Sequence, residues 1–290
     1  MKTYIVDSFT NESFKGNPAG VCFPENEVSE EVMLRIAQEL NLSETAFVKP
    51  DDKKNTYRIR YFSPKKEIAL CGHATLASAK VLFENTTENE IEFITIEGLH
   101  LFVSQDEDGE EITMEFPVYE TIPTTVTTEV LKALGIPAVT SSVFNSNHNI
   151  ILLEISEAQV LADLAPDFNT LVNSCSGING ILVTAPSDDQ RYDYHYRYFW
   201  PWSGSNEDPV TGGVQTFLAK YWGVKLNKKR MKAFQSSSRT GHMTVELIGN
   251  KVLLISRAVI VLEGNLVVFD REKNLKNLNL ENDRTEYIQK

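Results

Sequence analysis

Short runs of β-branched and aromatic residues dominate the chain, and each run is bounded by turn-forming residues. This pattern is typical of strands that bury at least one face. The polar segment 106–111 separates two such runs and predicts a hairpin turn. We therefore predict strands at 3–9, 19–23, 45–50, 56–63, 90–96 and 100–105 in the first half, and at 149–155, 179–186, 192–200, 243–249, 251–264 and 266–270 in the second.

One amphipathic helix is predicted between the early strands, at 29–40. Ser29 is its expected N-cap, and its apolar positions form one broad stripe, at Val32, Leu34, Ile36, Ala37 and Leu40. Shorter helical segments are predicted at 128–135 and 157–164. Because strands dominate and helices are few, the predicted fold class is α+β.

An internal repeat predicts two similar lobes. The sequence RYFSP at 60–64 recurs as RYFWP at 197–201, which is 137 residues further on, and the same offset carries Cys71 onto Asp208. CGHATLASAKVL then lies over DPVTGGVQTFLA, so each half has a strand, a loop of small residues and an apolar helix. We predict a first lobe at 1–119 around a helix near 72–84, and a second at 120–290 around a helix near 211–222. The last strands are expected to pack back on the first lobe.

Composition and charge narrow the class of protein. The chain has 290 residues and a formal net charge of −12, which argues against nucleic-acid partners because their backbones attract clustered Lys and Arg. The one basic run, 225–230, is expected to be a solvated turn. Three cysteines, no signal peptide and no membrane-length apolar run predict a cytoplasmic protein with no membrane partner.

The two loop-to-helix junctions of the repeat are the first candidates for a site. CGHAT at 71–75 and VTGGV at 210–214 place nearly bare backbone at a helix start, where free N–H groups and the helix dipole favour an anion. Close packing of a strand against a central helix also requires small residues, and for one junction alone it is the better interpretation. Two related junctions favour a cleft, with Gly72, Gly212 and Gly213 binding a small anionic substrate.

Titratable residues lie beside both junctions. Cys71 and His73 belong to the first, and Glu207 and Asp208 belong to the second. A single histidine or cysteine is more often structural, yet a thiolate or carboxylate at a helix N-terminus is stabilised as an anion and can serve as a base. No His, Cys or Asp spacing resembles a zinc set, so no metal is predicted, and no glycine-rich phosphate loop is present.

Two further polar residues are ambiguous on local grounds. Glu44 follows the 29–40 helix at the head of a strand, and Asn17 lies in the turn Gly16-Asn17-Pro18. For both residues, a solvated or structural turn is the better local interpretation, and a ligand-binding role remains open.

Four ordered blocks together resemble the PhzF-like family of the diaminopimelate epimerase-like superfamily. The blocks are an N-terminal segment ending in GNPAGV (6–21), LSETAF (42–47), LCGHATLA (70–77) and the segment from Arg197 to Val214, which contains EDPVTG. The resemblance extends from residue 3 to about residue 265.

This resemblance implies two pseudo-symmetric lobes, each a curled mixed sheet around a central helix, with the active site between them. It also implies cofactor-independent proton transfer in which Glu44 is the general acid/base and His73 and Asp208 are its polar partners. Amides near Gly72 and Gly212–Gly213 would hold the substrate carboxylate, with Asn17 and Cys71 nearby. A homodimer is expected from the resemblance alone.

The sequence departs from the family pattern at TGGV, where Gly213 and Val214 stand in place of serine and alanine. Three hypotheses follow. The first is a PhzF-like isomerase acting on a small carboxylated substrate, the second an epimerase using Cys71, and the third a binding or scaffold protein of the same fold. The intact set of Glu44, His73 and Asp208 favours the first.

Overall fold

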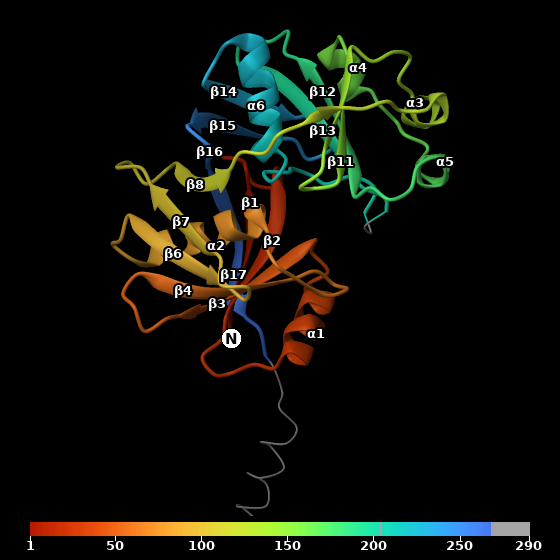
Figure 1. Ribbon diagram of the computed structural model, residues 1–290. Helices are drawn as coiled ribbons and strands as arrows, with labels where there is room; N and C mark the ends of the chain where they lie inside the picture. The colour runs from red at the N-terminus through yellow and green to blue at the C-terminus, as the bar shows by residue number, and fades with distance from the viewer. Residues whose placement is uncertain (203–204, 268–290) are drawn as a thin grey trace, which may run out of the picture.

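The computed structural model describes residues 1–202 and 205–267 and consists of two lobes (Figure 1). In the first lobe the elements, in chain order, are β1 (Lys2–Ser8), β2 (Asn17–Phe23), α1 (Glu30–Leu40), β3 (Glu44–Pro50), β4 (Thr56–Phe62), β5 (Glu67–Ile68), α2 (Gly72–Asn85), β6 (Glu90–Thr95), β7 (His100–Gln105) and β8 (Ile112–Pro117). Ser29 caps α1 by accepting the N–H of Val32, as expected.

The second lobe follows in the chain. Its elements are β9 (Ile122–Pro123), α3 (Thr128–Leu134), β10 (Ser141–Asn145), β11 (Ile150–Glu154), α4 (Ala158–Ala162), α5 (Phe168–Ser174), β12 (Gly180–Pro186), β13 (Tyr194–Phe199), α6 (Gln215–Leu226), β14 (Arg230–Gln235), β15 (Gly241–Ile248) and β16 (Lys251–Ser256). The chain then returns to the first lobe as β17 (Ala258–Asn265), which runs beside β1 (Figure 1).

Strand pairing in the two lobes follows the internal repeat. In the first lobe β2 and β3 are parallel, β3 and β4 antiparallel, and β4 and β6 parallel, with α2 connecting the last pair. In the second lobe β11 and β12 are parallel, β12 and β13 antiparallel, and β13 and β14 parallel, with α6 in the place of α2. The predicted α+β class is confirmed, and this order explains why RYF ends a strand twice.

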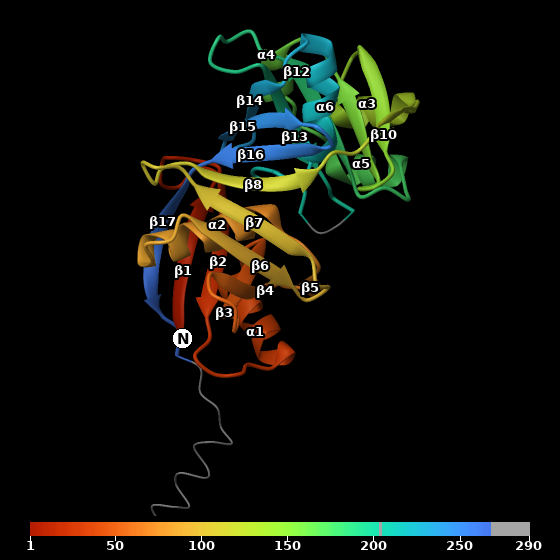
Figure 2. The ribbon, with the colours of Figure 1, turned by 60° about the vertical axis from the view of Figure 1, so that its left-hand side comes forward.

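The second half of the chain contributes a strand to the first lobe, since β17 pairs antiparallel with β1. Within the second lobe, the short strand β9 pairs antiparallel with β10. β8 and β16 pair antiparallel with each other where the lobes meet (Figure 2). The lobes therefore share one continuous hydrogen-bonded network, which limits how far they can move apart without breaking strand pairs.

The central helices fill the lobes to different extents. α2 is buried along almost its whole length, and its alanines allow the strands of the first lobe to approach closely. α6 is buried through its first turns by Phe217, Leu218 and Trp222, but Val224 near its end is 75% exposed. The apolar helix of the first lobe is therefore buried almost throughout, whereas that of the second lobe is exposed near its end.

Several predicted boundaries differ from the structure. The second central helix starts at Gln215 rather than near 211, because residues 211–214 form a turn. The predicted strand at 251–264 is two strands that are interrupted at Arg257. Of the strand predicted at 266–270, residues 266 and 267 are not in a strand, and the rest lies outside the described residues.

The basic run 225–230 includes the end of α6 and the start of β14, and Lys225 pairs with the buried Glu154.

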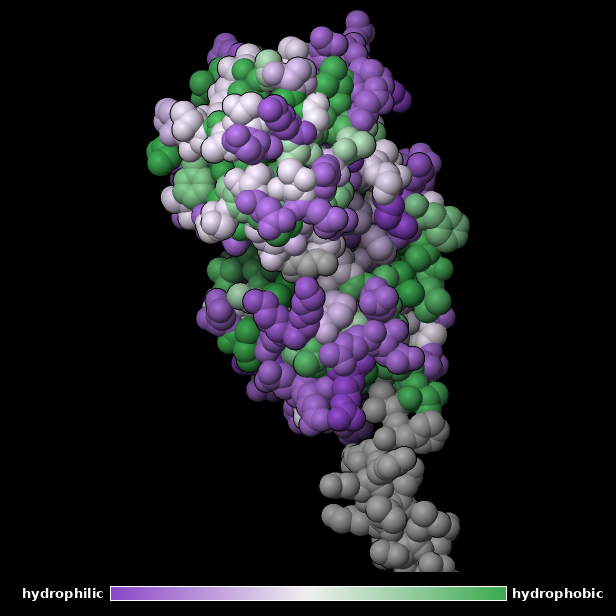
Figure 3. Space-filling model, turned by 90° about the vertical axis from the view of Figure 1, so that its right-hand side faces the viewer, coloured by the Kyte–Doolittle hydropathy of each residue, from purple (hydrophilic) through white to green (hydrophobic). Residues whose placement is uncertain are grey.

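The outer surface differs from this interior. Polar side chains cover much of the face of both lobes shown in Figure 3, and hydrophobic residues gather on the first lobe just below its junction with the second. Within residues 1–202 and 205–267, no helix combines the length and the apolar character needed to cross a membrane.

A pair of adjacent glycines provides a test of the packing between the lobes. A Cβ atom added at Gly212 would lie 2.7 Å from Phe9 Cζ and 3.1 Å from Leu254 Cδ2, whereas one added at Gly213 would meet nothing within 4 Å. We expect Gly212→Ala to lower the free energy of unfolding by about 1–3 kcal/mol through overpacking. Gly213→Ala is the matched control and should change it little. Urea denaturation of both variants measures the difference, and equal stabilities would contradict the packing described here.

Candidate active site

Asn17 connects the two lobes at the start of β2. Gly16, the residue before it, has φ +64°, and a Cβ atom there would lie 2.1 Å from the Ser8 carbonyl oxygen, so the turn requires glycine. The Asn17 side chain is fully buried, and its Nδ2 donates to Asp208 Oδ1 at 2.8 Å and to the Val210 carbonyl at 2.9 Å. The same nitrogen lies 3.4 Å from His73 Nδ1. One amide group therefore holds both helix junctions together.

Glu44 is the first residue of β3, and the strand register places it beside Ala19 of β2. Its carboxylate is buried, and Oε2 lies 3.3 Å from His73 Nε2. Burial raises the pKa of Glu44 to about 7, and the charge of Asp208 adds to this effect, while the Ser43 hydroxyl acts against it. A carboxyl group with this pKa can both accept and return a proton near neutral pH.

Cys71 and His73 occupy the N-terminus of α2. Cys71 is the N-cap residue, and its Sγ lies 3.3 Å from His73 Nδ1. Burial lowers the pKa of His73 to about 3, so its imidazole is neutral. Burial also raises the pKa of Cys71 well above 9, and the Glu44 charge adds to this increase, which outweighs the backbone amides of Ala74 and His73. The expectation of a thiolate stabilised by the helix N-terminus is therefore wrong, because desolvation is the larger effect.

Asp208 lies in the loop that precedes α6. Its Oδ2 accepts the Thr211 hydroxyl at 2.5 Å, and its carbonyl accepts Gln235 Nε2 at 2.6 Å. Burial raises the pKa of Asp208 to about 6 against the opposing hydrogen bonds from Thr211 and Asn17. Among the described residues no lysine or arginine pairs with Glu44 or Asp208. The site therefore holds two buried acids without a neutralising cation.

Glu207 has a structural role. Its two carboxylate oxygens accept Arg197 Nε and Nη2 at 2.7 and 2.8 Å. Arg197 Nη1 also donates to three carbonyls of the segment 161–164. The ion pair between Arg197 and Glu207 fixes the end of β13 and the loop that carries Asp208. Of the two adjacent acids, Glu207 is therefore structural and Asp208 belongs to the site.

The backbone at the start of α6 offers a place for an anion. The N–H groups of Gln215 and Thr216 donate to the carbonyls of Gly212 and Gly213, and no described residue accepts from the amides of Gly212, Gly213 or Val214. Gly72, at the other junction, has open space around it, with Phe116 Cζ 3.9 Å from an added Cβ. Gly212 is also required for close packing, because an added Cβ would collide with neighbouring side chains, whereas Gly213 borders open space.

Three residues near the site were not singled out from the sequence. Ser43 Oγ lies 3.4 Å from His73 Nε2, and Gln235 accepts the Thr211 N–H at 2.7 Å besides bonding Asp208. Ser43 and Thr211 both lie inside the motif blocks, next to Glu44 and three residues after Asp208. Gln235 ends a strand that was not predicted, and no local signal marks it.

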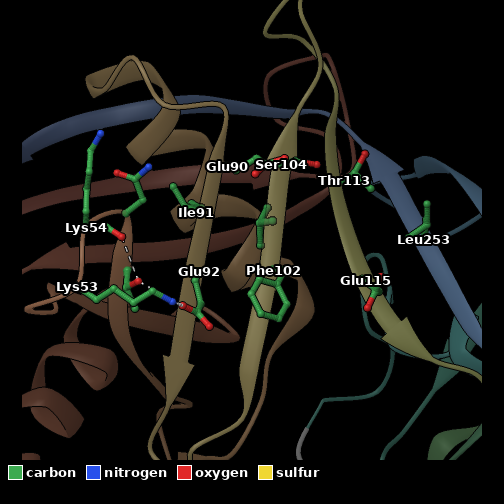
Figure 4. A pocket seen from close by; sticks show the side chains of 13 residues that line it. Lys53, Lys54, Glu90, Ile91, Glu92, Phe102, Ser104, Thr113, Glu115 and Leu253 are labelled. Carbon is green, nitrogen blue, oxygen red and sulfur yellow. Dashed lines mark hydrogen bonds and ion pairs between the residues drawn. The ribbon is translucent and has the colours of Figure 1, made fainter.

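A separate hollow of about 490 Å³ lies on the outer face of the first lobe (Figure 4). Glu92 and Phe102 of β6 and β7 line it, together with Lys53, whose Nζ donates to Glu92 at 2.7 Å. None of the predicted site residues lines this hollow. The convergent buried acids make the junction between the lobes the better candidate for an active site.

Comparison with known proteins identifies the family. The sequence model of the phenazine biosynthesis-like protein family (PhzC-PhzF) matches residues 6–264. The chain belongs to this family. It is 39% identical over 269 residues to an uncharacterized isomerase of Halalkalibacterium halodurans, covering 91% of this chain and 98% of the relative. It is 36% identical over 284 residues to the phenazine biosynthesis-like domain-containing protein of Homo sapiens, with the same coverage.

Solved structures extend the comparison to the fold. A PhzF-family protein from Enterococcus faecalis has a TM-score of 0.85 at 35% identity, covering 92% of this chain and 99% of that chain. A predicted epimerase from Pseudomonas aeruginosa has a TM-score of 0.68 at 16% identity, with the same coverage, and shares the fold. The resemblance, the fold class and the expectation of a PhzF-like isomerase are confirmed.

The buried acid of the second lobe makes a testable contribution to stability. The folded pKa of Asp208, about 6, lies above its ordinary value of 3.8, so the folded state favours the protonated acid. The contribution of protonated Asp208 to the free energy of unfolding is complete below the ordinary pKa of 3.8 and is lost as the pH rises through the folded-state pKa. As the pH rises from about 4 to about 8, we expect the free energy of unfolding of Asp208→Asn to increase by about 2–3 kcal/mol relative to that of the parent. Urea unfolding across this range measures the change, and parallel pH profiles would contradict it.

Proposed function

We propose that this PhzF-family protein is a cofactor-independent isomerase that moves a proton between carbon atoms of a small carboxylated substrate, with Glu44 as general acid/base. The observation that carries the proposal is the position of Glu44, a buried carboxylate 3.3 Å from the neutral imidazole of His73. Burial raises the pKa of this carboxyl to about 7, which suits a group that must take and return a proton.

Substrate binding would use the backbone at the start of α6. The amides of Gly212, Gly213 and Val214 are oriented as a helix N-terminus and suit a carboxylate. A carboxylate held there supports carbanion formation at the neighbouring carbon, because hydrogen bonds to its oxygens stabilise the charge that develops.

Proton transfer would then proceed in two steps. Ionised Glu44 removes a proton from carbon, and the electron pair left behind is delocalised toward the bound carboxylate. Protonated Glu44 returns the proton to a second carbon of the same conjugated system, so the reaction leaves the substrate's composition unchanged. His73 Nε2, in contact with Glu44 Oε2, holds the carboxylate in place. Asp208, whose oxygens accept the Asn17 amide and the Thr211 hydroxyl, helps to keep the pKa of Glu44 raised through its charge.

A second candidate is an epimerase that uses Cys71. Its supporting observation is the position of the thiol, 3.3 Å from His73 Nδ1 and within the same cluster as Glu44. The raised pKa of Cys71 disfavours it as the base that starts the reaction. The place equivalent to Cys71 in the second lobe holds Asp208 rather than a second thiol.

Solvent exchange separates these functions. Small amino acids, hydroxy acids and unsaturated carboxylates would be incubated in D₂O with the protein and followed by proton NMR. We expect deuterium incorporation into at least one of them, and we expect Glu44→Gln to reduce its rate by about 10²–10⁴-fold, the usual contribution of a general base. Cys71→Ala should retain most of the rate, and Cys175→Ala, outside the site, should retain all of it.

The opposite pattern identifies the alternatives. Loss of exchange in Cys71→Ala with retention in Glu44→Gln would replace the isomerase with the epimerase. No exchange with any carboxylate would support a binding or scaffold protein. The homodimer remains a prediction, which light scattering of the purified protein tests.

The open space at Gly213 leads to a prediction about substrate affinity. A serine side chain has room there and would add a hydroxyl beside the amides proposed to hold the carboxylate. Since one hydrogen bond contributes about 0.5–1.5 kcal/mol, we expect Gly213→Ser to lower KM by roughly 2–10-fold with little change in kcat. Gly213→Ala is the control for added bulk alone. A KM unchanged in Gly213→Ser, or lowered equally in both variants, would contradict this anchoring role.

A further inference from the structure

Three side chains with metal-ligating atoms come together at the candidate site. The ligand atoms of Glu44, Cys71 and His73 all lie within 4.8 Å of one another, and all three residues are buried. Glu44 begins β3, whereas Cys71 and His73 belong to the start of α2, so this set has no recognisable spacing in the sequence. The expectation that no metal binds rested on sequence spacing alone. The fold brings together ligand residues that lie far apart in the sequence.

The spacing of the donors suits a tetrahedral ion. Zinc bonds of about 2.0–2.3 Å at tetrahedral angles place nitrogen and oxygen donors about 3.4 Å apart and nitrogen and sulfur donors about 3.6 Å apart. His73 Nε2 lies 3.3 Å from Glu44 Oε2 and 3.9 Å from Cys71 Sγ. Both separations are within about 0.4 Å of those targets. Because Cys71 Sγ lies closer to His73 Nδ1, at 3.3 Å, the Cys71 side chain must rotate toward Nε2 before the three donors surround one ion.

The charge of the site also favours a cation. Glu44 and Asp208 are both buried, and no described lysine or arginine pairs with either. Buried carboxylates are costly unless they are paired, protonated or bound to a metal. The donor set of one thiolate, one imidazole and one carboxylate matches zinc and other borderline-soft ions, whereas Mg²⁺ and Ca²⁺ require several oxygen donors.

We infer that Zn²⁺ binds to Glu44, Cys71 and His73 and acts as an inhibitor of this site. Binding replaces the Cys71 S–H proton, which is released to solvent, with a zinc–sulfur bond and involves no change of oxidation state. The fourth position is left for water. The inhibitory consequence rests on the proposed function, because zinc coordinates the Glu44 carboxylate that would otherwise take the substrate's proton.

The binding test requires no substrate. Tag-free protein freed of metal with a chelator would be titrated with ZnCl₂ against a chromophoric zinc indicator. We expect one equivalent to bind, and we expect Cys71→Ser to weaken binding by more than the roughly 10–100-fold that loss of a merely supporting group causes. Cys175→Ala, which changes a thiol outside the cluster, should bind as the parent does, and MgCl₂ should not compete.

Cobalt gives a signature that a change in folding cannot mimic. Co²⁺ added to the metal-free parent should produce thiolate-to-cobalt charge-transfer absorption, which Cys71→Ser should lack and Cys175→Ala should retain. Equal zinc affinity in the parent and Cys71→Ser, or no thiolate band in the parent, would overturn the metal site.

The consequence for activity is measured separately. Zinc at one equivalent should suppress solvent exchange in the parent, and addition of chelator should restore it. Exchange that continues at full rate with zinc bound would overturn the inhibitory role. Failure of zinc binding would leave the isomerase proposal standing, since that proposal is tested in the metal-free protein.

Discussion

The arrangement of the site depends on the buried side-chain amide of Asn17. Its nitrogen donates to Asp208 and to the Val210 carbonyl in the second lobe and lies beside His73 of the first. Because both acceptors are buried, removing the amide would leave them unsatisfied and would separate the groups it brings together. The turn at Gly16 and the return of β17 to the first lobe help to place this one residue where the lobes meet.

Desolvation follows from that arrangement and determines the protonation of the site. It raises the pKa values of Glu44, Asp208 and Cys71 and lowers that of His73. The amides at the start of α2 act against this effect at Cys71 without overcoming it. The result is a neutral thiol and imidazole beside two acids that titrate near neutral pH, which is the condition that reversible proton transfer requires.

Much of this could be predicted from the sequence, for identifiable reasons. The repeated RYF strands and the apolar segments after them indicated two lobes with central helices, because periodicity and small residues are local signals. The start of α6 was misplaced, since a tertiary hydrogen bond from the Thr211 N–H to Gln235 holds residues before it in a turn. The contact between Glu44 and His73 and the neutral state of Cys71 depend on burial by distant strands, which no local pattern reports.

The central claim is that the buried Glu44 carboxyl is poised to exchange a proton near neutral pH. The most direct measurement is a ¹³C NMR titration of the Glu44 carboxyl carbon in metal-free protein, with Glu44→Gln used to assign the resonance. Asp208, Cys71 and His73 face this group, and Asp208→Asn would show how much its charge contributes. The structure predicts a midpoint of about 7 that falls in Asp208→Asn. A midpoint near the ordinary value of 4.5 would contradict the account.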